Sequence, residues 1–98
     1  MADNHAVVVA GRRIQAVVPF DELDSSIGRI DLTGRLLAPG FLDLQVNGGG
    51  GQLFSNSPDT DTLRLICRAH RKSGTTALLP TLISGNVKAM QTAIAAVH

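Results

Sequence analysis

The sequence has no tryptophan, no tyrosine and only one cysteine, Cys67, among its 98 residues. A lone cysteine cannot form an internal disulfide, and the first residues, MADNHAVVVAGRR, lack the basic-then-apolar order of a secretory signal. Both observations favour a cytoplasmic protein. No apolar run approaches the roughly 18 residues that a membrane-spanning helix requires, so membrane insertion is not expected.

Charge of one sign is not in excess either, because nine Lys and Arg stand against eight Asp and Glu. This balance argues against nucleic acid or an anionic membrane as the main partner. Basic residues do gather in one stretch, which contains Arg64, Arg68, Arg71 and Lys72. A solvated helix face with cations near its C-terminal end is favoured here over a phosphate-binding site.

The composition, 44% hydrophobic and 17% charged, is that of a globular chain, and the length suits one small domain. Residues 6–19 place two β-branched runs around Gly11-Arg12, which is typical of a hairpin. Residues 29–32 and 35–40 flank Thr33-Gly34 in a second strand, turn, strand pattern. We therefore predict that residues 1–38 are β-rich and form part of a small β-sandwich.

From residue 39 the pattern changes to alternating strands and helices. A strand over 41–47 precedes a helix that Ser57 is expected to cap and Gly74 to terminate. A second strand, over 75–79, precedes a helix that begins after Asn86. Two strand-helix units with short connections predict parallel strands, as at the start of an α/β barrel or of a doubly wound sheet.

The stretch FLDLQVNGGGG, residues 41–51, carries the strongest indication of a site. Alternation along a strand is expected to place Phe41, Asp43, Gln45 and Asn47 on one face and Leu42, Leu44 and Val46 on the other. Burying the two amides without partners would cost roughly 1–3 kcal/mol each, so a polar group should meet them. A bland alternative is an edge strand whose polar residues face solvent, followed by a flexible glycine connection.

Three quoted segments carry a resemblance to a known family. LLAPGFLDLQVNGGGG, together with GTTALLPTLIS and the lead-in GRRIQAVVPFDEL, resembles the start of the N-acetylglucosamine-6-phosphate deacetylases of the amidohydrolase superfamily. Most amidohydrolases carry His-x-His at the end of the first barrel strand. This chain has Gln45-Val46-Asn47 followed by Gly48 at that place, which is the replacement typical of the deacetylases.

The resemblance implies that residues 39–98 begin a (β/α)8 barrel of a metal-dependent hydrolase. It implies a divalent metal, most simply zinc, an amino-sugar phosphate substrate, and a homo-oligomer. Gln45, Asn47, Gly48 and Gly49 would line the substrate and metal pocket, with the amides as weaker metal ligands than imidazole. The family's metal-binding Glu and His and its catalytic Asp come from later strands, beyond residue 98, so the chain alone is expected to bind no metal and to be inactive.

Other candidate residues are given structural roles. His5, His70 and His98 have no ligand spacing and are expected at the surface or in packing, and Asp43 is expected to hydrogen-bond inside the barrel rather than act as a base. Apolar stripes recur at helical spacing on both helices: Leu63, Ile66, Cys67 and His70 on the first, and Val87, Met90, Ile94 and Val97 on the second. Cys67 is therefore expected in the core rather than as a reactive thiol.

One alternative belongs to a different class of function. Unfinished sheets have unpaired edges, and residues 7–9 or 77–79 would then seek partners in a non-catalytic, self-associating α/β module. Thr81, near the carboxyl end of the second strand, either touches the site or stabilises a turn. Another sugar or pyrimidine amidohydrolase is disfavoured by the absent His-x-His.

Overall fold

The computed structural model describes residues 3–98, which divide into two compact units: unit 1 extends to Leu37 and unit 2 begins at Ala38. The length alone predicted one domain, whereas the structure has two compact units. Unit 1 closes its own hairpin, and every buried hydrophobic residue among residues 3–98 belongs to unit 2. Within the described residues no helix is both long and apolar enough to cross a membrane.

Unit 1 contains the predicted hairpin. Strands β1 (His5–Ala10) and β2 (Arg13–Pro19) pair antiparallel through a two-residue loop, in which Gly11 has a φ of 59°. A positive φ in such a loop matches the twist of the flanking strands and favours glycine. A short 3-10 helix, η1 (Phe20–Glu22), follows directly.

The predicted second strand pair of unit 1 is wrong. Residues 29–32 and 35–40 form no strand, although the turn between them is present, with Gly34 at a φ of 74°. Local hydrogen bonds hold this turn: Thr33 donates its backbone N–H to the Asp31 carboxylate, and Arg35 donates to the Leu32 carbonyl. The side-chain pattern was compatible with strands, but these residues pair with no partner strand in the described part of the chain.

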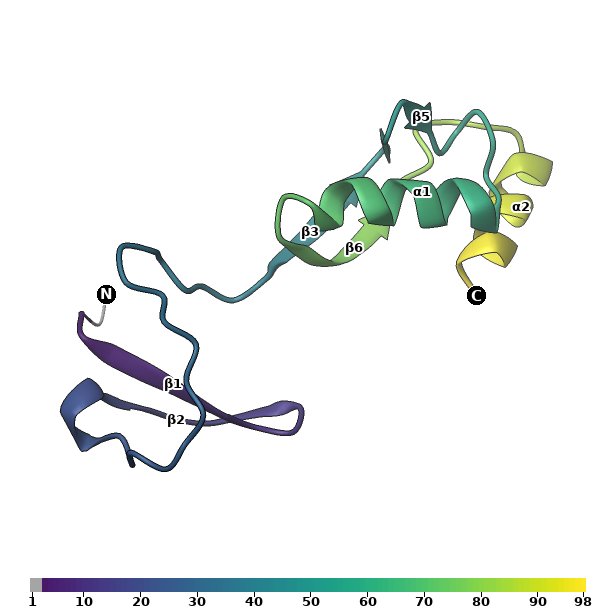
Figure 1. Ribbon diagram of the computed structural model, residues 1–98. Helices are drawn as coiled ribbons and strands as arrows, with labels where there is room; N and C mark the ends of the chain where they lie inside the picture. The colour runs from purple at the N-terminus through teal and green to yellow at the C-terminus, as the bar shows by residue number, and fades with distance from the viewer. Residues whose placement is uncertain (1–2) are drawn as a thin grey trace. The chain divides into compact units, whose positions relative to one another are not determined.

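Unit 2 is a mixed α/β arrangement of two helices with small sheets (Figure 1). Strands β3 (Phe41–Val46) and β6 (Thr75–Pro80) pair in parallel and are connected through helix α1 (Thr60–Arg71). Helix α2 (Val87–Val97) follows β6. The predicted order of strand, helix, strand and helix is therefore confirmed, and so is the parallel pairing of the two strands.

Both helices of unit 2 begin at a side chain that accepts a hydrogen bond from the first turn. Asn86 caps α2 as predicted, accepting from the Ala89 N–H at 2.9 Å. The predicted cap of α1 is wrong, since Asp59 rather than Ser57 accepts from the Thr62 N–H, at 2.7 Å. This hydrogen bond holds the pKa of Asp59 below its ordinary value of 3.8. Because helical hydrogen bonding starts at Thr60, Ser57 lies two positions too early to reach a free N–H.

The core of unit 2 is small and lies where α1 and α2 meet the strand ends. It consists of four buried residues with partly buried neighbours: Val46, Phe54, Ile66 and Ala93, with Leu63, Leu78, Leu82 and Ala96 around them. Cys67 is exposed, so its predicted place in the core is wrong. The predicted stripe of α2 is likewise exposed, from 47% at Met90 to 69% at Val87, because the helix packs through Ala93 instead.

Candidate functional site

The carboxyl ends of β3 and β6 lie side by side and are joined by hydrogen bonds between their loops. Thr81 donates its backbone N–H to the Val46 carbonyl at 2.8 Å, and Ile83 donates to the Ser55 hydroxyl at 3.0 Å. The Thr81 hydroxyl lies 3.4 Å from the Leu79 carbonyl, which favours the turn-stabilising role. Residues from three separate stretches of sequence therefore meet at the carboxyl ends of β3 and β6.

A bulge in β3 changes which residues share a face. Asp43 pairs with Leu78 and Val46 with Pro80, so the pairing on β3 advances one residue further than on β6. Because Leu78 and Pro80 lie two apart and share a face, Asp43 and Val46 do as well. The predicted strict alternation, with Asp43 on the same face as Gln45 and Asn47, is therefore wrong.

Gln45 precedes and Asn47 follows Val46, the last residue of β3, which is buried in the core. Gln45 is exposed, whereas Asn47 is half-buried. The side-chain oxygen Oδ1 of Asn47 is buried and has no hydrogen-bond partner in the described residues. A buried acceptor without a donor costs roughly 1–3 kcal/mol, so this oxygen is the feature of the edge best suited to receive a donor or a cation.

The four glycines form a short hairpin with specific geometry. Strands β4 (Gly48–Gly49) and β5 (Gln52–Leu53) pair antiparallel, and Gly50 and Gly51 between them have φ values of 61° and 83°. Two consecutive positive φ angles define a type I′ turn, which glycine adopts without strain. A Cβ on Gly48 would lie 2.2 Å from the Gln52 carbonyl oxygen, so that position also requires glycine. The run is a packed hairpin rather than the flexible connection of the bland alternative.

Helix α1 supports this hairpin through His70. The His70 Nε2 lies 2.9 Å from the Gly48 carbonyl oxygen, and its Nδ1 lies 3.7 Å from the Asp43 carboxylate. The expected packing role of His70 is consistent with this position, but sequence reasoning missed its two polar partners. Asp43 was expected to hydrogen-bond inside a barrel, yet it faces α1. No spacing in the sequence could have indicated these contacts, because Gly48 and His70 are 22 positions apart.

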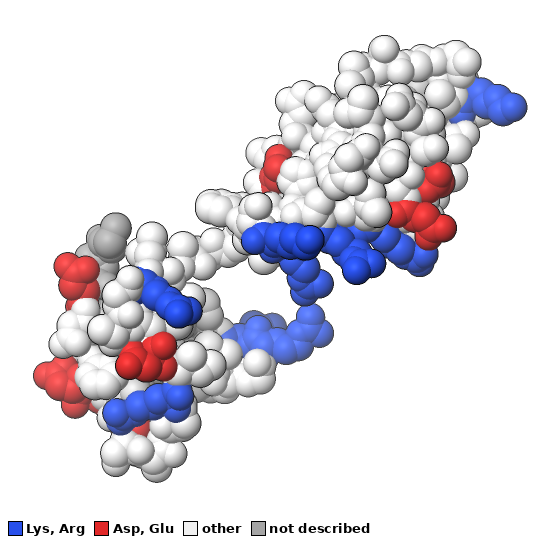
Figure 2. All heavy atoms as spheres, turned by 45° about the horizontal axis from the view of Figure 1, so that its top comes forward, with Lys and Arg blue, Asp and Glu red and all other residues white. Residues whose placement is uncertain are grey.

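The exposed side of α1 carries the basic residues noted in the sequence. Figure 2 shows Lys and Arg side chains gathered along one side of unit 2, and Arg64, Arg68, Arg71 and Lys72 are all exposed. The Arg64 guanidinium forms an exposed ion pair with Asp61 at 2.9 Å. Exposure agrees with the predicted solvated face, and such surface pairs contribute little to stability.

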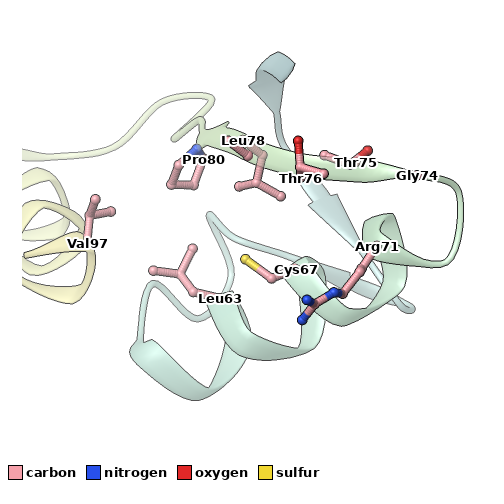
Figure 3. A pocket seen from close by; sticks show the side chains of 10 residues that line it. Leu63, Cys67, Arg71, Gly74, Thr75, Thr76, Leu78, Pro80 and Val97 are labelled. Atoms are coloured by element: carbon pink, nitrogen blue, oxygen red, sulfur yellow. The ribbon is translucent and has the colours of Figure 1, made fainter. Parts of the chain in front are cut away.

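A groove of unit 2 lies elsewhere, between α1, β6 and the end of α2. It has a volume of about 560 Å³ and is mostly apolar, and Leu63 and Cys67 point into it from α1 (Figure 3). Neither Gln45 nor Asn47 lines this groove. This groove is therefore separate from the two amide side chains, although Pro80 at the end of β6 lines it.

The described residues do not fit a complete metal site. Among residues 3–98 no group of three or more His, Cys, Asp or Glu side chains is placed to hold a metal ion. The half-buried His70 directs both ring nitrogens to protein groups, at Gly48 and Asp43. The Asn47 oxygen alone is a single weak ligand.

The chain is similar to known proteins at the level of a family model and of a solved structure. The family model described as NagA composite domain matches residues 1–37. The crystal structure of N-acetylglucosamine-6-phosphate deacetylase from Pasteurella multocida matches 97% of the chain with a TM-score of 0.87 and 37% identity, and the matched part is 25% of that protein.

The sequence relatives include deacetylases named for two amino-sugar phosphates. The N-acetylglucosamine-6-phosphate deacetylase of Haemophilus influenzae is 40% identical over 89 residues, which cover 91% of this chain and 23% of that protein. The N-acetylgalactosamine-6-phosphate deacetylase of a Shewanella species is 53% identical over 66 residues, covering 67% of this chain and 17% of that protein. The chain thus matches part of deacetylases named for N-acetylglucosamine 6-phosphate and, in the Shewanella relative, for N-acetylgalactosamine 6-phosphate, and it spans about a quarter or less of the relatives it matches. The resemblance stated from the sequence is confirmed.

Proposed function

We propose that this chain forms part of a deacetylase that hydrolyses the acetamide of N-acetylglucosamine 6-phosphate to glucosamine 6-phosphate and acetate. The observation that carries the proposal is the match to the Pasteurella multocida deacetylase over 97% of the chain. The parallel pair β3–β6 with its connecting helix also supports the further proposal that residues 39–98 begin a (β/α)8 barrel, with residues 1–38 in a small β-sandwich.

Gln45, Asn47, Gly48 and Gly49 are proposed to line the substrate and metal pocket. In barrels of this type the reacting groups sit at the carboxyl ends of the strands, where these residues lie. The unpartnered Asn47 oxygen is suited to accept a hydrogen bond from a substrate amide or from a water molecule. The exposed Gln45 side chain can donate and accept beside it.

A divalent metal, most simply zinc, is proposed for the complete deacetylase. When bound, such an ion polarises an amide carbonyl and lowers the pKa of its water. The described residues do not supply a full set of ligands, so the chain's own contribution is to bind and orient groups through Gln45 and Asn47. We accordingly propose that the 98-residue chain by itself has no deacetylase activity.

A chimera tests the proposal directly. Residues 1–98 would replace the matching part of the Haemophilus influenzae deacetylase, and acetate release from N-acetylglucosamine 6-phosphate would be measured with added zinc. The chimera is expected to release acetate, and the 98-residue chain alone is not. A chimera that folds, as judged by circular dichroism, but releases no acetate would contradict the proposal. Turnover by the chain alone would overturn its proposed inactivity.

The second substrate to compare is the galactosamine epimer. The Shewanella relative, named for N-acetylgalactosamine 6-phosphate, is 53% identical over 66 residues. Assaying the chimera with both epimers, against the unaltered Haemophilus influenzae enzyme, asks whether residues 1–98 alter the preference. Unchanged preference would place the determinant of the epimer outside this chain.

Self-association is a second candidate function, and one observation favours it. Leu42, Leu44 and Leu79 on the β3–β6 pair are 69%, 74% and 59% exposed, which is an apolar surface suited to a protein partner. Sedimentation of the chain over a wide concentration range would test both this and the homo-oligomer proposal, and a monomer throughout would count against them for this chain. The cytoplasmic location and the exclusion of nucleic acid and membrane as partners remain predictions from the sequence.

A further inference from the structure

His70 links helix α1 to the glycine hairpin through a hydrogen bond whose direction is fixed by chemistry. The Gly48 carbonyl oxygen can only accept, so the His70 Nε2, 2.9 Å away, must carry the proton and donate it. The opposite nitrogen, Nδ1, faces the Asp43 carboxylate at 3.7 Å. This distance is too long for a hydrogen bond.

Packing fixes the hairpin against the same ring. A Cβ built on Gly49 would lie 2.9 Å from both Cδ2 and Nε2 of His70, so the ring occupies space that only glycine leaves free. One turn earlier on α1, Leu65 approaches a Cβ built on Gly50 to 3.1 Å. The hairpin therefore rests on two successive turns of the helix, and His70 supplies the polar contact.

Asn47 lies between two fixed points. On its N-terminal side is Val46, which is buried in the core, and on its C-terminal side is Gly48, whose carbonyl is bonded to His70. The Asn47 carbonyl itself accepts from Phe54, the buried residue at the far end of the hairpin, at 2.8 Å. The orientation of the Asn47 side chain therefore depends on where the hairpin is held.

We infer that His70 is a positioning residue, which fixes the glycine hairpin on α1 and thereby holds the Asn47 oxygen at the carboxyl end of β3. The significance of that oxygen for deacetylation rests on the proposed function. The positioning itself does not, because it is a property of this chain and can be measured without substrate or metal.

Nuclear magnetic resonance of the unaltered chain gives the first test. The His70 ring is expected to carry a proton on Nε2 that exchanges with solvent more slowly than the ring protons of His98, which lies at the exposed end of α2. A His70 ring without a proton on Nε2, or with one that exchanges as fast as those of His98, would overturn the inference. This measurement needs no variant and so does not depend on one folding.

Two variants give the second test. His70→Phe keeps a flat ring but has no donor, whereas His70→Gln keeps an amide donor at about the position of Nε2. Loss of one hydrogen bond is expected to speed exchange of the Phe54 amide about three- to tenfold in His70→Phe, with the Ala89 amide of α2 unchanged as internal reference. His70→Gln is expected to restore the rate to within about twofold. Equal effects of both variants would contradict positioning through the donor. Acetate release by the chimera tests the proposed function separately, so either idea can fail alone.

Discussion

Units 1 and 2 differ in how each is stabilised. Up to Leu37 the described contacts are mainly hydrogen bonds of the β1–β2 ladder and of the turn around Thr33, with an Arg29–Phe20 cation–π contact. From Ala38 onward, four buried hydrophobic residues connect both helices to the strand ends. An isolated two-stranded hairpin is marginal in water, whereas a parallel pair covered by helices buries apolar surface. The two units should therefore respond differently to the same kind of change.

The largest expected effect comes from emptying the core of unit 2. Ile66 is fully buried, so Ile66→Ala should lower the free energy of unfolding of unit 2 by roughly 2–5 kcal/mol. Urea titration followed by amide exchange would measure this, and the β1–β2 amides should be unaffected. Ile94→Ala, at a position 59% exposed, is the matched control and should have a small effect. Equal destabilisation of both units by Ile66→Ala would show that they fold as one.

A smaller effect is expected from adding one methyl group to the glycine hairpin. The Cβ in Gly48→Ala would meet backbone at 2.2 Å, which side-chain movement cannot relieve. Overpacking of this kind should destabilise unit 2 by roughly 1–3 kcal/mol. The control belongs to unit 1: a Cβ on Gly28 meets nothing within 4 Å, so Gly28→Ala should be close to neutral. Thermal unfolding of both variants would compare them, and a neutral Gly48→Ala would mean that the hairpin is not packed as described.

The smallest expected effect is that of pH on one helix end. The Thr62 N–H lowers the pKa of Asp59 below 3.8, so the ionised carboxylate is the form that the folded chain favours. Its contribution is present above about pH 4 and is lost as the pH falls through the lowered pKa. The amide of Thr62 should report this in an acid titration, and Asp59→Asn should keep the cap while removing the pH dependence. In unit 1, hydrogen bonds from Thr33 lower the pKa of Asp31 in the same direction. If the amide signal of Thr62 still changed with acid pH in Asp59→Asn, the pH dependence would not come from the Asp59 carboxylate.

Much of the fold of unit 2 follows from local sequence. The end of α1 near Gly74, the Asn86 cap and the β-branched start of β6 are each decided by a residue's own hydrogen bonds or backbone preference, so they were predictable. The Asp59 cap was missed because two capping residues lie close together, and only the helix start selects between them. In unit 1 the same local reasoning gave the hairpin but overpredicted strands at 29–32 and 35–40, since strands also need partners.

The features of the candidate site also fall into those that the local sequence determines and those that require the tertiary structure. The sequence by itself determined that amides end the first strand of unit 2 and that four glycines follow, because those residue types are written in the chain. Only the tertiary structure decided that a bulge turns Asp43 toward α1, that the glycines form a hairpin seated on His70, and that the Asn47 oxygen is buried without a partner. These features depend on register and on contacts between residues far apart in the chain, which local propensity does not specify.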